Sequence, residues 1–382
     1  MLSLDCGAEF DPAREDEFFA ALPARPGVLL VEGRAASAQP YLLRTADLRR
    51  RLERLLRAPE AALARLRSPQ APRLNLREFA ARVRYRQTGS AFEQSLVLYQ
   101  QAREIFPQRY RALLRLRPAA LLKVNLASEY PRCYVTRRIL ADTGFYFGPF
   151  PGRRAAEAFA DQFLNLFKIR RCQIKIRRDP SFPGCMYSEM KMCLAPCFAG
   201  CSKPEYDVEV SRVLDFLGSG GASLTGEFGR EREAASEALD FERASALHRR
   251  IEKVAEVLRG LPDLARRISE IDAVVLQPAV EQQTIAVFAV RGGMIGDPFF
   301  LRFAELASQP RSVEEILREW LGSVFVSERS AQDRDALADH LALVARWFYS
   351  KPRVGEVFFL QNGDWPYRRI IRACSRLLAA PA

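Results

Sequence analysis

Long apolar runs are absent from this 382-residue chain, although 48% of its residues are hydrophobic. No stretch reaches about eighteen apolar residues, the length that a membrane-spanning helix requires. The opening segment, MLSLDCGAEFDPARED, has acids where a signal peptide has basic residues, and it has no apolar core. We therefore expect a cytoplasmic protein with no membrane contact, large enough for two or three domains.

Histidine is also scarce, since His248 and His340 are the only two in the chain. This leaves little material for a mixed Cys/His zinc motif, and the tight C-x-x-C turn of many structural zinc sites is missing as well. Cysteine, in contrast, is concentrated. Five of the eight cysteines lie within thirty residues, at Cys172, Cys185, Cys193, Cys197 and Cys201. Because cytoplasmic thiols stay reduced, this cluster favours metal or redox chemistry over disulfides.

The first four of these cysteines are separated by twelve, seven and three residues. Four thiolates can hold either a tetrahedral zinc ion or an iron–sulfur cluster. The unequal gaps and the proline before Cys197 fit a cubane cluster, but spacing alone leaves zinc and iron–sulfur open. Free structural thiols are the least favoured alternative, because unliganded cysteines seldom crowd in this way.

The charge balance points to a polyanionic partner. The chain has 58 basic and 46 acidic residues, a net charge of +12, and arginine dominates its basic clusters. The planar guanidinium suits phosphate contacts, so we expect DNA binding, with solvated helix faces as the alternative. The arginines expected to contact DNA are Arg44, Arg49, Arg50, Arg51, Arg137, Arg138, Arg170 and Arg171.

Hydrophobic periodicity predicts a mixture of helices and strands. Strands are expected at 26–33, 40–43, 121–126 and 132–140, and several more after residue 268, including 356–360. Helices are expected at 16–22, 46–67 with a break at Pro59, 91–105, 153–167, 204–260 with a break at GSGGAS, 312–322 and 333–348. The predicted fold class is therefore α+β. The segment 144–152, GFYFGPFPG, is interpreted as a turn-rich lead into the helix that follows it.

Three sequence elements together resemble a known family. The stretch YPRCYVTRRILADTGFYFGPFPGRRAAEAFADQFLNLFKIRRC at 130–172, the MCLAPC element at 192–197 and LDFERASALHRRIEKV at 239–254 occur in the order seen in the UvrC excinuclease family. The last is similar to the UVR motif, whose family core is Leu-Asp-Phe-Glu-Ala-Ala. The resemblance implies a [4Fe–4S] cluster on Cys172, Cys185, Cys193 and Cys197, with zinc as the alternative, and leaves Cys201 outside the ligand set.

The same resemblance implies four regions. Residues 1–115 would form a degenerate GIY-YIG nuclease-like domain and 116–203 a connector with the cysteine cluster. Residues 204–262 would form a helical UVR region, and 263–382 a C-terminal α/β domain. In the family the UVR hairpin docks on the matching motif of UvrB, a second protein of the excinuclease. The residues expected to make that contact here are Leu239, Phe241, Glu242, Ala244 and Leu247.

The GIY-YIG resemblance departs from the family pattern where the chemistry occurs. Tyr41 and Arg51 match a tyrosine and an arginine of the nuclease, but Leu29 replaces its first tyrosine. Tyr99 aligns with the metal-binding glutamate and Arg111 with an asparagine. A tyrosine hydroxyl with a pKa of about 10 cannot replace a carboxylate metal ligand. We therefore treat Tyr41 and Arg51 as vestigial and expect no catalytic residue.

The motif Asp-Ile-Ser-His, which opens the second nuclease of full-length family members, does not occur, and the helix-hairpin-helix elements are not found. We expect a non-cleaving, UvrC-like DNA-binding protein of nucleotide excision repair that contacts a UvrB-type helicase. A divergent metal-dependent GIY-YIG endonuclease is the first alternative. A scaffold or RNA-binding protein derived from the same fold is the second. The oligomeric state is not predicted.

Overall fold

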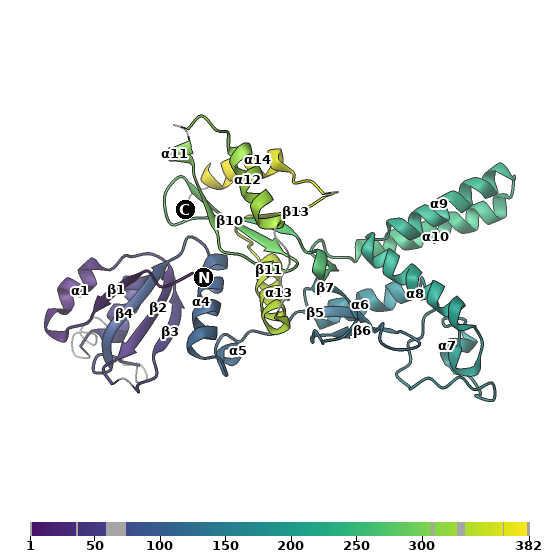
Figure 1. The fold of residues 1–382 in the computed structure, drawn as a ribbon, viewed down its shortest axis with the longest axis horizontal. Helices are drawn as coiled ribbons and strands as arrows, with labels where there is room; N and C mark the ends of the chain where they lie inside the picture. Colours follow the sequence, from purple (N-terminus) through teal and green to yellow (C-terminus); the bar gives the residue numbers. More distant parts are fainter. Residues whose placement is uncertain are drawn as a thin grey trace, which may run out of the picture.

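The computed structural model describes residues 2–35, 37–58, 74–306, 309–326, 333–361 and 363–379. Three antiparallel sheets succeed one another along the chain, and one long helical hairpin projects from the side of the molecule (Figure 1). This mixture of helix and sheet confirms the predicted α+β class. Within the described ranges, no helix is long and apolar enough to cross a membrane. The expected break at Pro59 lies outside the described residues.

The first sheet has the strand order β1-β4-β2-β3. Its two faces are covered by different helices because side chains alternate along each strand. Val28 and Leu30 of β2 pack with α4, whereas Leu29 and Val31 pack with α1 and α2. The elements are β1 (Cys6–Glu9), η1 (Pro12–Arg14), α1 (Glu15–Ala21), β2 (Gly27–Gly33), β3 (Tyr41–Thr45), α2 (Leu48–Leu56), β4 (Ala80–Gln87), α4 (Ala91–Ile105) and α5 (Tyr110–Leu113).

The second sheet has the order β6-β5-β7-β8. Its last strand, β8, lies beyond residue 262 yet pairs with β7, so the described C-terminal part contributes an edge strand to this sheet. The segment at 144–152 contains β7, where the sequence suggested only a turn. The elements are β5 (Ala120–Val124), β6 (Cys133–Thr136), β7 (Phe145–Phe150), α6 (Arg153–Leu164), α7 (Met186–Glu189), η2 (Pro196–Phe198), α8 (Lys203–Gly218) and β8 (Arg266–Arg267).

The projecting hairpin consists of α9 (Ala222–Glu237) and α10 (Phe241–Arg259). The expected break at GSGGAS separates α8 from α9, where Gly220 and Gly221 adopt positive φ. A second break that the sequence did not predict, at 238–240, separates α9 from α10. Leu224 and Phe228 of α9 and Val254 and Val257 of α10 join the apolar core that extends from the second sheet.

The third sheet has the order β11-β10-β9-β13, and β12 also pairs with β10. Its faces are covered by α12 and α14 on one side and by α13 on the other, as the two apolar cores that meet at β9 and β10 show. The elements are η3 (Ile268–Glu270), β9 (Ala273–Pro278), β10 (Thr284–Arg291), β11 (Met294–Ile295), β12 (Phe299–Arg302), α11 (Phe303–Leu306), α12 (Val313–Val326), α13 (Arg334–Phe348), β13 (Glu356–Phe359) and α14 (Tyr367–Ala379).

One continuous apolar core joins the first and third sheets. Phe92 of α4 lies edge-on to Phe288 of β10, with ring centroids 5.1 Å apart, and also contacts Trp347 of α13. Gly89 permits this close approach, because a Cβ atom there would come within 2.3 Å of the Ala279 carbonyl carbon. Helix α13 therefore lies in the centre of the molecule, between the N-terminal sheet and the middle sheet (Figure 1).

Candidate functional site

The four predicted metal-ligand cysteines lie in one irregular segment that the structure gathers beside the middle sheet. Cys185 precedes the short helix α7, and Cys197 lies within the turn η2. Burial is the main cause that raises the pKa of the Cys193 thiol to about 11; the Ala195 N–H lowers it, and the thiols of Cys172, Cys197 and Cys185 add to the increase. Charges influence one another's pKa only at short range, so these thiols lie within electrostatic range of Cys193.

The backbone around the last two cysteines is held in an uncommon conformation. Lys191, Ala195 and Ala199 all adopt left-handed φ values between 56° and 61°. This geometry costs free energy for residues with a Cβ atom and is concentrated at ligand clamps and functional loops. Because Ala195 adopts it, its N–H donates to the Cys193 sulfur at 3.3 Å.

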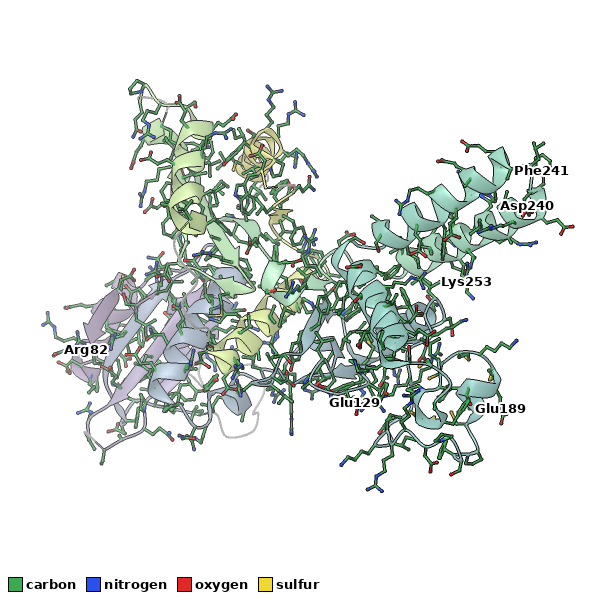
Figure 2. The ribbon with its side chains drawn as sticks, turned by 45° about the vertical axis from the view of Figure 1, so that its right-hand side comes forward. Arg82, Glu129, Glu189, Asp240, Phe241 and Lys253 are labelled. Carbon is green, nitrogen blue, oxygen red and sulfur yellow. The ribbon has the colours of Figure 1, made fainter. Side chains whose placement is uncertain are left out.

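The cysteine segment is fastened to the middle sheet and to α8 by buried polar contacts. The Lys168 N–H donates to the Glu209 carboxylate at 2.6 Å, and the Arg170 N–H donates to the Tyr206 hydroxyl at 2.9 Å. The Tyr206 hydroxyl in turn donates to the Pro131 carbonyl at 2.7 Å. Glu189 of α7 lies at the outer end of the segment (Figure 2). The base of the segment is therefore rigid while its outer loop reaches solvent.

In the part of the chain that the structure describes, no three His, Cys, Asp or Glu side chains converge to hold a single metal ion. Zinc requires four ligand atoms about 2.0–2.3 Å from one point. A cubane cluster makes a weaker demand, because each of its thiolates binds a different iron atom.

Cys201 differs from these four in its surroundings. It is buried and packs in the apolar core with residues of the middle sheet and α8. Burial raises the pKa of its thiol, and Glu205 raises it further. The Cys197 thiol also contributes to this increase in pKa.

The arginines expected to bind DNA divide into exposed and structural groups. Arg44, Arg50, Arg137 and Arg138 are exposed, whereas Arg51 and Arg171 are half-buried. Arg170 is only 7% exposed, and its guanidinium donates to the carbonyls of Tyr130 at 2.7 Å and Ile174 at 2.9 Å. This side chain braces the cysteine segment.

Arg49 also has a structural role. Its guanidinium donates to the carbonyls of Leu22 at 2.7 Å and Ala20 at 3.2 Å, which ties α2 to the end of α1. The arginine side chains that can reach a phosphate backbone are consequently fewer than the sequence suggested.

The five residues expected to contact a partner divide in the same way. Leu239 and Phe241 are 72% and 66% exposed, and Figure 2 shows Phe241 at the far end of the hairpin. Glu242 is exposed beside them. Leu247 is buried between the two helices, and Ala244 is half-buried against the same core. The hairpin thus presents an apolar tip on a stalk that Ala244 and Leu247 help to hold together.

The positions aligned with the nuclease active site lie on opposite faces of the first sheet. Leu29 faces α2, and Tyr41 and Leu43 pack against the same core. Arg51 belongs to α2. Tyr99, on α4, packs against the other core, with α13. The structure therefore brings Tyr41, Arg51 and Leu29 to one face and leaves Tyr99 on the other.

Tyr99 and Arg111 belong to a polar network centred on Asp339 of α13. The Asp339 carboxylate is 1% exposed and accepts hydrogen bonds from the Tyr110 hydroxyl at 2.6 Å and Arg111 Nε at 2.8 Å. The Tyr99 hydroxyl lies 3.5 Å from the same carboxylate. Burial, followed by the Asp339 charge, raises the pKa of Tyr99 to about 12. Both positions thus contribute to the contact between α4–α5 and α13.

The middle of the chain matches a known protein family. Residues 120–216 match the family described as UvrC/Cho excinuclease, middle domain. These residues run from the start of β5 into the last turn of α8 and contain the four predicted ligand cysteines. The chain is UvrC-like.

Two curated relatives show how much of the UvrC-like chain is similar to known proteins. The UvrABC system protein C of Carboxydothermus hydrogenoformans is 29% identical over 287 residues, which cover 75% of this chain and 45% of that protein. The UvrABC system protein C of Moorella thermoacetica is 27% identical over 307 residues, which cover 80% and 48%. The UvrC-like chain therefore spans less than half the length of these relatives. No solved structure matches it.

Sequence reasoning missed the carboxylate that organises the contact between the N-terminal and C-terminal parts of the UvrC-like chain. Asp339 and Arg111 are 228 positions apart, and the helix that carries Asp339 looks like an ordinary amphipathic helix. The sequence contained one signal that could have revealed this contact. Asp339 and His340 are adjacent polar residues in a helix whose other buried side chains are apolar.

His340 gives this contact a pH dependence. Its Nδ1 accepts a hydrogen bond from the Ile295 N–H at 2.9 Å, and burial lowers its pKa to about 4. Because the folded-state pKa lies below the ordinary value of about 6.5, the stabilisation is present above pH 6.5 and is lost as the pH falls toward 4. Lowering the pH from 7 to 5 should decrease the free energy of unfolding by about 2 kcal/mol through this group.

Urea denaturation at the two pH values measures this loss. The matched variant His340→Asn retains a short acceptor for Ile295 but has no group that titrates in this range, so its stability should fall less between pH 7 and pH 5. Equal losses in the two proteins would contradict the assignment.

Proposed function

We propose that this UvrC-like chain is a DNA-binding protein of nucleotide excision repair that holds a [4Fe–4S] cluster and does not cleave DNA. One observation carries the proposal: the UvrC/Cho middle-domain match covers the segment that contains Cys172, Cys185, Cys193 and Cys197. The relatives named UvrABC system protein C provide the repair context. Each remaining part of the proposal has its own support.

The cluster would be held by the four neighbouring thiols. The Ala195 N–H that donates to Cys193 would partly neutralise a thiolate, and so would the Arg170 guanidinium 4.0 Å from the Cys172 sulfur. A cluster here would cross-link the irregular loop to the middle sheet, since Cys172 follows the braced residue Arg170. Its first role would be structural.

DNA would contact the exposed arginines Arg44, Arg50, Arg137 and Arg138. Arg44 and Arg50 belong to the first sheet and its helix α2, and Arg137 and Arg138 follow β6 of the middle sheet. Arginines spread over two parts of the molecule suit contact with the phosphate backbone of DNA, which depends on charge more than on base sequence.

A UvrB-type helicase would bind the tip of the α9–α10 hairpin. Leu239 and Phe241 are the most exposed large apolar side chains of the hairpin, and Leu239 is held at the turn in a left-handed conformation with φ of 57°. Asp240 fixes the turn because its carboxylate accepts from the Arg243 N–H at 3.0 Å. An exposed apolar tip on a polar stalk is typical of a protein-binding surface.

The non-cleaving assignment is supported by the surroundings of Tyr99. Its side chain is 1% exposed, beneath α13, and faces the Asp339 carboxylate. A glutamate substituted there would be buried beside another carboxylate, a placement that opposes ionisation of either group. The position is thus unsuited to binding a divalent metal within reach of DNA.

The cluster is tested by anaerobic purification. The protein should be brown and contain about four irons and four sulfides per chain. Changing Cys193→Ser or Cys197→Ser should bleach it and lower its iron content. The matched control Cys201→Ser should keep its iron because that thiol packs in the core. A colourless protein with one zinc would refute the cluster, and iron loss in the control would show that the wrong four cysteines were chosen.

DNA binding is tested through its salt dependence. Each duplex phosphate contact contributes about 0.9 to the slope of log affinity against log salt, so Arg50→Ala with Arg138→Ala should flatten the slope by up to about 1.8. The control pair Arg49→Ala and Arg77→Ala removes the same charge from guanidiniums bonded to backbone carbonyls, since Arg77 donates to the carbonyls of Leu56 at 3.1 Å and Pro12 at 3.0 Å. It should lower thermal stability and leave the slope unchanged.

If the Arg50/Arg138 variant has the same salt slope of DNA affinity as the unaltered protein, the assignment is contradicted. Arg50 and Arg138 would then be solvent-exposed residues that do not contact DNA. Preferential binding of single-stranded RNA in competition with DNA would favour the RNA-binding alternative.

A further inference from the structure

Two adjoining cavities lie where the three sheet-containing parts of the chain meet. The first has a volume of about 480 Å³ and lies between β3, helices α4 and α5, and α13. The second, of about 370 Å³, lies between the segment before β5, the end of β7 and α13. Arg115 and Arg346 line both cavities, so the two form one groove along α13. Each volume falls within the range of about 300–1,000 Å³ that is usual for ligand sites.

Only one sign of charge lines this groove. Six arginines contribute to it, and among the described residues that line either cavity there is no Asp or Glu. These arginines are Arg44, Arg109, Arg115, Arg117, Arg137 and Arg346. An uncompensated row of guanidiniums favours a polyanion with several charges spaced along it.

Hydrogen bonds to neutral oxygens hold three of the groove arginines without satisfying their charge. Arg44 donates to the Ser95 hydroxyl at 3.2 Å, Arg137 to the Pro118 carbonyl at 3.0 Å, and Arg346 to the Arg115 carbonyl at 2.8 Å. Withdrawal from water, followed by repulsion from Arg44, lowers the pKa of Arg346. Nearby Arg103 and Arg111, in contrast, pair with carboxylates of α13 and of the residue that caps it. The charge of the groove is therefore left for a ligand.

The floor of the first cavity is apolar. Leu42, Leu98, Phe106, Leu114 and Leu343 line it, with Tyr41 at the β3 side. Phosphates alone would make no use of such a floor, and a duplex keeps its base faces stacked inside. A single strand offers both components, because its backbone carries charge while its unpaired bases can pack on apolar and aromatic side chains.

We propose that this groove binds single-stranded DNA, with phosphates along the six arginines and an unpaired base on the apolar floor beside Phe106. The inference rests on the proposed DNA-binding function and deepens it by naming the form of DNA and the surface. It also gives a role to Arg109, Arg115, Arg117 and Arg346, which the sequence-based assignment of DNA contacts did not include.

The experiment measures the affinity of the full chain for three fluorescent DNA probes of equal length at the same salt concentration. The probes are a single strand, a duplex, and an abasic strand that has the backbone without bases. The full chain should bind the single strand roughly tenfold more tightly than the abasic strand, because one stacked base supplies that margin. The variant Arg109→Ala with Arg117→Ala should weaken single-strand binding and flatten its salt slope by about 1.4.

The matched control is Arg82→Ala with Lys253→Ala. It removes the same charge at Arg82, at the outer end of the first sheet, and at Lys253, on the hairpin (Figure 2). Neither residue lines the groove, so the change should leave single-strand binding unchanged. Thermal melting of each variant checks that it is folded.

Failure of the groove and failure of the proposed function give different results. If the Arg109/Arg117 variant binds the single strand as the unaltered protein does, or if the abasic strand binds equally well, the groove assignment is overturned while DNA binding stands. If no probe binds, both fail. Tighter binding of an RNA strand of the same sequence would overturn DNA as the occupant.

Discussion

The buried carboxylate of Asp339 is the contact on which the arrangement of this molecule depends. It lies on α13, and two side chains of the α4–α5 region donate to it, namely Tyr110 and Arg111. A buried charge is tolerated only when it is paired and hydrogen-bonded. The network around Asp339 therefore fixes how the third sheet packs on the first. The apolar contacts of Phe92 with Phe288 and Trp347 bury surface between the same two parts of the molecule. The polar network fixes the orientation in which those apolar surfaces meet.

Two functional features follow from that packing. The arginine groove exists because α13 lies beside α4 and α5, so Arg346 and Leu343 complete a cavity that the N-terminal part alone would leave open. The same packing buries Tyr99, at the position that the nuclease resemblance assigned to a metal-binding glutamate. The contact that completes the groove thus also covers the position to which the nuclease resemblance assigned a metal ligand.

Local patterns predicted most helices and several strands well, but not every element. Helix α4 begins and ends at the predicted residues, since Ser90 caps its start and accepts from the Glu93 N–H. Strand β7 was missed because the glycines and prolines of GFYFGPFPG resemble a turn, although all six residues of the strand are buried. The strands β1 and β4 and helix α14 were not predicted either. Strand β8, of two residues, has no pattern to detect.

The candidate site was predictable in part. Cysteine spacing located the segment that the structure gathers, because the cysteines are close in sequence. Exposure was not predictable from residue type: Arg49 and Arg170 look like DNA contacts in the sequence, yet both donate to backbone carbonyls. The network of Asp339 and the groove along α13 depend on contacts across more than two hundred residues. No local motif encodes contacts of that separation.

A plasmid-nicking assay tests the central claim, that this chain binds DNA without cutting it, most directly. Anaerobically purified protein is incubated with supercoiled DNA, with and without lesions, in Mg²⁺ or Mn²⁺, and open circles are quantified. The account predicts DNA binding under these conditions with no nicks above the metal-only background. Nicking that disappears in Tyr41→Phe or Arg51→Ala would contradict it and establish the divergent endonuclease instead.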